Sequence, residues 1–294
     1  MGGAEIPPRA AGLVIASATI WGTVAIVVKV LVETIDPAVI AFIRLALGGV
    51  LITTVLLLRR SSRGILANYR LILFGGVGMA LNYLLYTIGL QYTLASAAAM
   101  VVQSEVVFLV TLSVILLGES FGPRRIAGMV LALLGVVIIS WNGQELSTLF
   151  ASEYFLGNVI VFFAGFFWAI YAYSQKRLTG EQDILASLSP IMLISSAILL
   201  PLALPELGSL TTLDPGEVVA LLYLGLICTG VSYMSLAEGL KRINASITGV
   251  LTTVMPVTSV ILAYLLLKEV LTAYMIVGAA LDICGILLVV TSRE

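Results

Sequence analysis

Four ionisable side chains interrupt long apolar stretches of this sequence: Arg44, Glu105, Glu238 and Asp282. An ionisable group inside a membrane costs at least about 2.5–3.5 kcal/mol and usually marks a functional site or pairs with an opposite charge. Because desolvation disfavours the charged form of a carboxyl group, Glu105 is expected either to carry a proton or to face the ammonium group of a substrate. Asp282 is a second candidate proton carrier.

The same four groups also have a structural interpretation. Arg44 is expected to pair with Glu105 or Asp282 in a structural bridge, and Glu238 lies close enough to a span end to meet Lys241 or Arg242. A purely structural role for Glu105 stays open.

Aromatic and amide side chains form a second set of candidates. "WGTVAIVVK" begins at Trp21 and "WAIYAYSQK" at Trp168, and each tryptophan lies about halfway along an apolar stretch, where its indole N–H needs a partner. At 100° per residue, Trp168, Tyr171 and Gln175 fall on one helix face. We predict a polar pocket or, alternatively, tight helix packing with internal hydrogen bonds. The predicted substrate-binding residues are Trp21, Asn82, Tyr83, Tyr86, Trp168, Tyr171, Gln175, Tyr233 and Thr252.

The composition is that of a chain buried in lipid. Of the 294 residues, 60% are hydrophobic and 11% are charged, whereas soluble domains carry about 25% charged residues. A membrane-spanning helix needs about 20 mostly apolar residues, so we predict an all-α membrane protein with ten transmembrane helices. The predicted spans are 10–32, 37–58, 71–92, 94–118, 123–142, 155–176, 184–204, 216–239, 244–267 and 272–291.

The basic residues predict the orientation of these spans. With the N-terminus inside, 12 of the 15 Lys and Arg residues fall on the inner side, two (Lys29 and Lys268) fall outside, and Arg44 lies within a span. Cytoplasmic loops carry an excess of Lys and Arg, so both termini are expected to be cytoplasmic. Glu119 and Glu269 end their spans near water and are expected to cap neighbouring loops.

The two halves of the chain repeat each other. Residues 83–140 align without a gap with residues 233–290, and 15 of the 58 aligned positions are identical, among them Tyr83 with Tyr233 and Gly128 with Gly278. Five helices per half is an odd number, so the second half would enter the membrane from the opposite side. We predict a five-helix repeat in residues 1–145 and an inverted one in residues 146–294, a common transporter design. Duplication that serves only to build a stable bundle is the alternative.

The order of the motifs resembles the EamA branch of the drug/metabolite transporter superfamily. These motifs are the Trp-Gly at Trp21 with Lys29 eight residues after the tryptophan, Arg44 in the second span, and "LLGE" at 116–119 with its counterpart "LLKE" at 266–269. The resemblance covers almost the whole chain in both halves. It implies a ten-helix exporter of small metabolites, often amino acids.

One position departs from the pattern of this family. Glu105 and Val106 stand where the second half has Met255 and Pro256. Pro256 frees a backbone carbonyl beside the polar stripe that contains Thr252, and unwound backbone of this kind can bind polar substrate atoms. Because the fourth span lacks this proline, the sequence does not predict whether the span is kinked like the ninth.

These features predict a secondary transporter that exports small neutral or zwitterionic metabolites, such as amino acids, by alternating access. An antiporter of phosphorylated sugars or nucleotide sugars would need Lys or Arg at depth, and only Arg44 is a strong candidate, since Lys29 and Lys176 lie near the rims. A channel is a further alternative. The chain is not expected to be an enzyme, because it has no His for a metal or dyad site and Asp282 has no second intramembrane Asp.

The expected partners are a small-molecule substrate and the lipid bilayer, with proton coupling left open. We expect neither a metal, a cofactor nor a nucleic acid. A monomer and a homodimer are both compatible with the sequence. The compact chain without a targeting extension is expected to be a multi-pass protein of a prokaryotic inner membrane.

Overall fold

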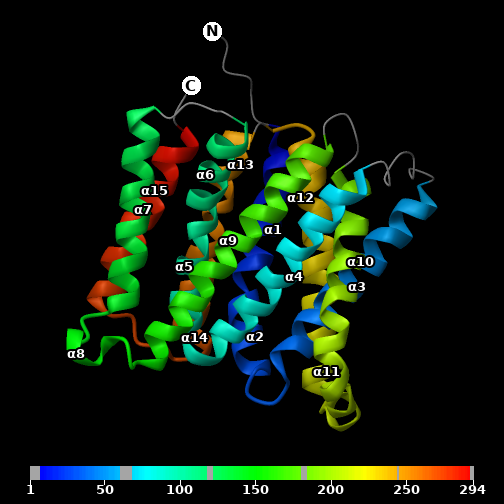
Figure 1. Ribbon diagram of the computed structural model, residues 1–294, viewed down its shortest axis with the longest axis horizontal. Helices are drawn as coiled ribbons and strands as arrows, with labels where there is room; N and C mark the ends of the chain where they lie inside the picture. Colours follow the sequence, from blue (N-terminus) through cyan, green and yellow to red (C-terminus); the bar gives the residue numbers. More distant parts are fainter. Residues whose placement is uncertain (1–6, 60–67, 118–121, 180–183, 244, 292–294) are drawn as a thin grey trace.

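The computed structural model describes residues 7–59, 68–117, 122–179, 184–243 and 245–291, and these form a bundle of helices (Figure 1). The elements are α1 (Pro8–Gly22), α2 (Val24–Leu31), α3 (Pro37–Leu58), α4 (Tyr69–Tyr92), α5 (Ala95–Val101), η2 (Val102–Ser104), α6 (Glu105–Leu117), α7 (Pro123–Trp141), α8 (Leu146–Leu149), α9 (Glu153–Thr179), α10 (Ile184–Ala203), η3 (Leu204–Thr212), α11 (Pro215–Leu222), η4 (Tyr223–Val231), α12 (Ser232–Leu240), α13 (Ala245–Thr252), α14 (Val254–Leu266) and α15 (Ala273–Thr291).

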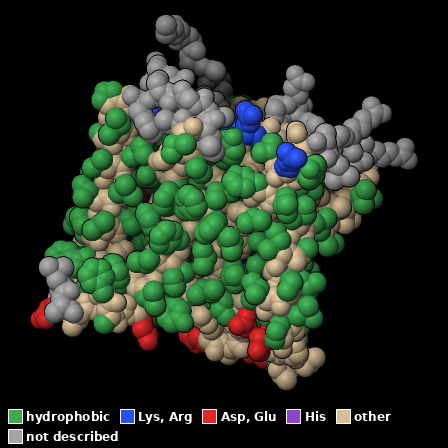
Figure 2. All heavy atoms as spheres, viewed as in Figure 1, with side chains coloured by type: hydrophobic (Ala, Val, Ile, Leu, Met, Phe, Trp, Pro, Cys, Tyr) green, Lys and Arg blue, Asp and Glu red, His purple; other side chains and the backbone are tan. Residues whose placement is uncertain are grey.

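Ten helical stretches among the described residues are long and apolar enough to cross a membrane, which confirms the ten predicted spans. Figure 2 shows a broad band of hydrophobic side chains, with Lys and Arg near one edge and Asp and Glu along the other. Such a band matches the hydrocarbon core of a bilayer, and the polar edges match its two aqueous surfaces. The chain is a multi-pass membrane protein.

The two edges of the bundle can be named from the ends of the helices. α1 begins and α15 ends on the same side, which we call the terminus face, and α11 begins on the other side, which we call the opposite face (Figure 1). Arg70 and Lys176 lie at helix ends on the terminus face. Glu119, predicted to cap a loop, lies outside the described residues.

Proline and acidic caps define several helix starts. Pro37 is the first residue of α3, and the Asp36 carboxylate accepts a hydrogen bond from the backbone N–H of Ala38 (2.8 Å). Asp214 and Glu217 form a capping box at the start of α11. Proline is tolerated in the first turn, where its missing N–H has no helical partner, and the caps satisfy the remaining donors.

Four of the spans are interrupted near their middle. The first breaks at Thr23 between α1 and α2, and the ninth breaks at Thr253 between α13 and α14. The eighth contains η4, a nine-residue π-helix. The fourth passes through the 3₁₀ turn η2 immediately before Glu105, so it is interrupted even without a proline. Irregular helical turns of this kind are common at functional sites.

The fifth and tenth spans cross at glycine contacts. A Cβ at Gly128 would meet the Gly285 carbonyl, and a Cβ at Gly135 would meet the Gly278 carbonyl, each closer than side-chain atoms normally approach. Moving seven residues forward on α7 moves seven residues back on α15, so the two helices run antiparallel. Small residues allow this close approach of membrane helices.

Candidate substrate cavity

A cavity of about 840 Å³ lies within the bundle. Its walls come mainly from α1, α3, α4, α6, α9, α12, α13 and α15. The lining extends to Arg125 near the start of α7, Lys176 near the end of α9 and Leu240 at the end of α12, all near the terminus face. None of the described lining residues belongs to the helix ends at the opposite face. The cavity therefore extends from the middle of the bundle toward one face only, and its size is that of a small-molecule site.

The structure brings every predicted substrate-binding residue to this one cavity. They are Trp21, Asn82, Tyr83, Tyr86, Trp168, Tyr171, Gln175, Tyr233 and Thr252. Arg44 and Glu105 border the same cavity, whereas Asp282 does not. Their contact with a substrate stays a prediction.

Five of these residues form a continuous aromatic surface, which we call the aromatic wall: Trp21, Tyr83, Trp168, Tyr171 and Tyr233. Ring centroids are 5.9 Å apart for Trp168 and Tyr171, 6.5 Å for Tyr171 and Tyr233, and 5.1 Å for Tyr233 and Trp21, all edge to face. Tyr83 belongs to the same packed cluster. Edge-to-face pairs at these separations are favourable, so the wall is held together by its own ring contacts as well as by the helices.

Three of the predicted polar residues are anchored to the backbone. The Trp21 indole donates to the Cys228 carbonyl in η4 (2.9 Å), Asn82 donates to the Ala164 carbonyl (2.9 Å), and Gln175 donates to the Ile184 carbonyl (2.9 Å). These three residues therefore line the cavity and also form internal hydrogen bonds, as the alternative of helix packing predicted. Trp168 forms no hydrogen bond in the described part of the chain, which leaves its ring free to contact a ligand.

Arg44 occupies a buried position and has no counter-ion among the described residues. Its guanidinium carbon lies 4.5 Å from the centroid of the Tyr83 ring, and the side chain is only 5% exposed. The Nε and Nη1 atoms have no hydrogen-bond acceptor within the part of the chain that the structure describes. The predicted bridge to Glu105 or Asp282 is not formed among the described residues: Asp282 packs against Gly135 of α7, and Glu105 borders the cavity without an ion pair.

Glu105 is the first residue of α6, directly after the η2 turn. Its side chain is half-buried and borders the cavity, with no hydrogen bond or ion pair within the described chain. Gly165 of α9 packs against this turn, and a Cβ there would lie 3.0 Å from the Glu105 backbone nitrogen. The close approach of α9 fixes the turn that presents the Glu105 carboxyl group.

Asp282 lies instead at the crossing of α15 with α7. It is 0% exposed, and neither carboxyl oxygen has a hydrogen-bond partner in the described ranges. The Asp282 Cβ lies next to Gly135 of α7, and a side chain at position 135 would collide with this Cβ. Asp282 is not among the described residues that border the central cavity.

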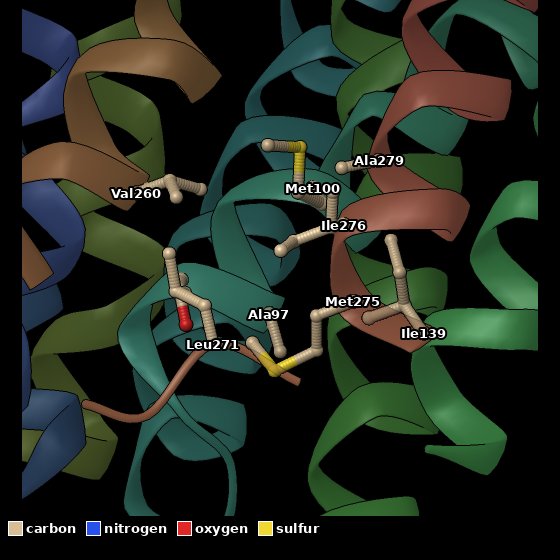
Figure 3. A pocket seen from close by; sticks show the side chains of 9 residues that line it. Ala97, Met100, Ile139, Val260, Leu271, Met275, Ile276 and Ala279 are labelled. Carbon is tan, nitrogen blue, oxygen red and sulfur yellow. The ribbon is translucent and has the colours of Figure 1, made fainter. Parts of the chain in front are cut away.

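Lys29 lies near the end of α2 and is bound to the backbone there. The Lys29 ammonium donates to the Leu90 carbonyl (2.8 Å), and this hydrogen bond joins α2 to α4. Because the Lys29 side chain is held there, it is not among the described residues that line the cavity. A second cavity of about 40 Å³ lies between α5, α7, α14 and α15, and its labelled walls, including Met100, Leu271 and Met275, are apolar (Figure 3). Metabolite sites usually have volumes of about 300–1,000 Å³, so this space is a packing void.

Sequence reasoning missed several lining residues. Gln103 is 7% exposed and borders the cavity beside Glu105, and Ser113 lies farther along α6. Their polarity inside an apolar span was the available signal. Arg125 and Lys176, both in the lining, place basic groups nearer the terminus face.

The sequence is similar to several known transporters and exporters. It is 26% identical to a probable amino-acid metabolite efflux pump of Escherichia coli, over 91% of this chain and 90% of the relative. It is 26% identical to an uncharacterized transporter of Archaeoglobus fulgidus, over 94% of this chain and 95% of the relative. A probable terminal-alkyne amino-acid exporter of Streptantibioticus cattleyicolor is 24% identical over 74% of this chain and 71% of its own length.

The fold has a solved counterpart as well. A crystal structure superposes with a TM-score of 0.67 over 95% of both chains at 21% sequence identity, which supports the fold alone. The sequence matches the EamA-like transporter family twice, over residues 8–141 and 155–291. Because these two stretches cover most of the chain, the protein belongs to the EamA-like transporter family, within the drug/metabolite transporter superfamily.

Proposed function

We propose that the protein is a secondary transporter that exports small neutral or zwitterionic metabolites, such as amino acids. The observation that carries this proposal is the cavity of about 840 Å³, which is lined by aromatic and polar side chains and extends toward one face only. A solute site open to one side of a membrane at a time is the requirement for alternating access. The two relatives named as amino-acid exporters or efflux pumps support the same substrate class.

The terminus face is proposed to be cytoplasmic, since the sequence places 12 of 15 basic residues on that side. The cavity then extends toward the cytoplasm, as a loading state of an exporter would require. A location in a prokaryotic inner membrane is part of the proposal.

The halves 1–145 and 146–294 are proposed to be inverted repeats that rock against each other. The glycine contacts support this: Gly128 faces Gly285 and Gly135 faces Gly278, so aligned positions of the fifth and tenth spans exchange places across an antiparallel crossing. A two-fold axis in the membrane plane produces this reciprocity.

Tyr83 and Tyr233, which occupy aligned positions of the two halves, also lie together, because both belong to the aromatic wall. Substrate would then bind next to the axis, where the two halves meet.

A phosphorylated-sugar or nucleotide-sugar antiporter is the second candidate. Three basic residues, Arg44, Arg125 and Lys176, border the cavity. However, Lys29 is bound to the Leu90 carbonyl and does not reach inward, and Glu105 places a carboxyl group in the same space. Paired basic groups suit phosphate, and here only Arg44 lies deep.

Glu105 and Asp282 are the proposed candidates for proton coupling. An enzyme activity is not proposed, and a monomer and a homodimer remain equally compatible with the fold.

Uptake into proteoliposomes tests the proposal. Purified protein is reconstituted, and a panel of radiolabelled amino acids, neutral sugars and sugar phosphates is offered with and without a proton gradient. Saturable uptake of one or more amino acids is expected. Flux that rises linearly with concentration would indicate a channel, and exchange of sugar phosphates alone would favour the second candidate.

A further inference from the structure

Two opposite charges face the central cavity without neutralising each other. Arg44 and Glu105 both line it, and neither forms an ion pair or a hydrogen bond within the described chain. Both lie within electrostatic range of the Tyr86 hydroxyl, which places them in one region of the cavity. Ionisable groups in a membrane interior are normally paired, so the two together suggest a missing partner that carries both charges.

The guanidinium group of Arg44 defines the anionic end of that partner. Its Nε and Nη1 donors have no acceptor among the residues that the structure describes, and the ring of Tyr83 covers one side of the group at 4.5 Å. A cation held over an aromatic ring keeps its edge available for hydrogen bonding, and a carboxylate binds that edge with two parallel bonds. Each such edge combines Nη2 with either Nε or Nη1, so a carboxylate would satisfy one of the two donors that have no acceptor in the described chain.

The carboxyl group of Glu105 defines the cationic end. A dianionic phosphate on Arg44 would leave excess negative charge beside Glu105, whereas an ammonium group balances it. One guanidinium and one carboxylate together match a ligand with no net charge.

The aromatic wall defines the remaining part of the ligand. Tyr83, over which Arg44 lies, packs in the same cluster as Tyr171 and Tyr233. A ligand anchored on Arg44 therefore has its other substituents against aromatic rings, which favour apolar groups.

Building on the proposed transport function, we propose that the cavity binds an α-amino acid with an apolar side chain as a zwitterion, with its carboxylate on Arg44, its ammonium group on Glu105 and its side chain against the aromatic wall. A free carboxylate and a free ammonium group are then both required for binding. Amino-acid esters, N-acyl amino acids and simple amines each lack one of the two charges.

Competition in proteoliposomes tests this with the unmodified protein. Exchange of radiolabelled leucine is measured against unlabelled leucine, leucine methyl ester, N-acetyl-leucine and isoamylamine. Each missing charge removes hydrogen bonds to an ionised group, so leucine should compete at least about tenfold better than each analogue. Equal competition by the ester or the N-acetyl compound would overturn the two-charge site while leaving transport intact.

Two variants assign the charges to residues. In Arg44→Gln the preference for leucine over its methyl ester should fall to within about twofold, and in Glu105→Gln the preference over N-acetyl-leucine should fall likewise. The matched controls Arg70→Gln and Glu206→Gln change exposed residues of the same types and should keep both preferences. A merely structural role would lower all rates without altering these ratios.

Other outcomes remain distinguishable. If Arg44→Gln does not fold, Arg44→Lys is measured in its place. The lysine keeps the positive charge but cannot form two parallel hydrogen bonds, so only part of the preference for leucine over its methyl ester should remain. Saturable transport of other neutral solutes without leucine would overturn the two-charge site alone. Absence of saturable transport for the whole panel would overturn the proposed function itself.

Discussion

Glu269 is bound to Ser96 across the two halves of the chain. The Glu269 carboxylate accepts hydrogen bonds from the Ser96 backbone N–H (3.0 Å) and hydroxyl (2.5 Å), and also from the Ala95 backbone N–H (2.7 Å). It is 8% exposed and caps the first turn of α5 at the opposite face. The expected cap at this position is therefore present, and it joins α5 to the segment after α14 on the side where the cavity is closed.

Removing this charge should loosen the opposite face. Glu269→Gln replaces hydrogen bonds to an ionised group with weaker neutral ones, a loss of about 1–2 kcal/mol, or roughly 5–30-fold in the equilibrium of local opening. Hydrogen–deuterium exchange of the peptide that contains α5, followed by mass spectrometry, should show faster exchange by that factor.

Glu153→Gln is the matched control, since Glu153 is exposed at the start of α9 on the same face. Exchange in α5 should not respond to it. Unchanged exchange in Glu269→Gln would mean that other contacts alone hold this face closed.

The ten spans could be predicted because each depends on a strong local signal, a run of about 20 apolar residues. Tilts, rotations and interruptions depend on neighbours and could not be predicted. The fourth span is interrupted at η2 although no proline lies there, and Gly165 of α9 packs closely against that turn. The π-helix η4 likewise lies in a stretch that looks continuous in sequence, and only the structure shows that its Cys228 carbonyl binds Trp21.

The site was predictable in its members but not in its pairings. Helical spacing grouped Trp168 with Tyr171, and midspan position singled out Trp21; all three line the cavity. The pairing of Arg44 with Asp282 failed because the glycine crossing of α7 and α15 fixes the rotation of α15 and turns Asp282 away from the cavity. A single sequence shows that a charge is buried, but not which interface buries it.

The Trp168 ring should contribute directly to substrate binding. Trp168→Ala removes a ring that borders the cavity and forms no hydrogen bond within the described chain. Lost ring contacts of about 0.5–1.5 kcal/mol, together with lost apolar burial, should raise the KM for uptake about tenfold or more.

Trp141→Ala is the control for this change, because Trp141 packs against Tyr274 (5.2 Å between ring centroids) outside the cavity lining. The KM of Trp141→Ala should stay within about twofold of the KM of the unmodified protein, because substitutions at the surface usually have small effects. Equal KM values for the two variants would remove Trp168 from the binding site.

The glycine crossing of α7 and α15 should be required for stability. In Gly135→Val the new side chain would collide with the Gly278 carbonyl and the Asp282 backbone nitrogen, so the helices must separate. Overpacking of this kind costs about 1–3 kcal/mol, which should lower the melting temperature of the detergent-purified protein by several degrees. Gly12→Ala, with no atom within 4 Å of the added Cβ, should leave it unchanged. A Gly135→Val melting temperature equal to that of the unmodified protein would contradict the close crossing.

Asp282 should affect coupling without affecting substrate binding. Its side chain is fully buried between α7 and α15 and is not among the described residues that border the cavity. Asp282→Asn keeps the shape of this side chain but removes the carboxyl group that could bind and release a proton. Leucine exchange, which needs no net proton movement, should keep its KM, whereas accumulation driven by a proton gradient should be lost if this carboxyl group carries the proton. Measuring both activities in one proteoliposome preparation separates the roles. Retained accumulation would leave Glu105 as the remaining proton candidate, and a raised KM for exchange would contradict the position of Asp282 outside the cavity.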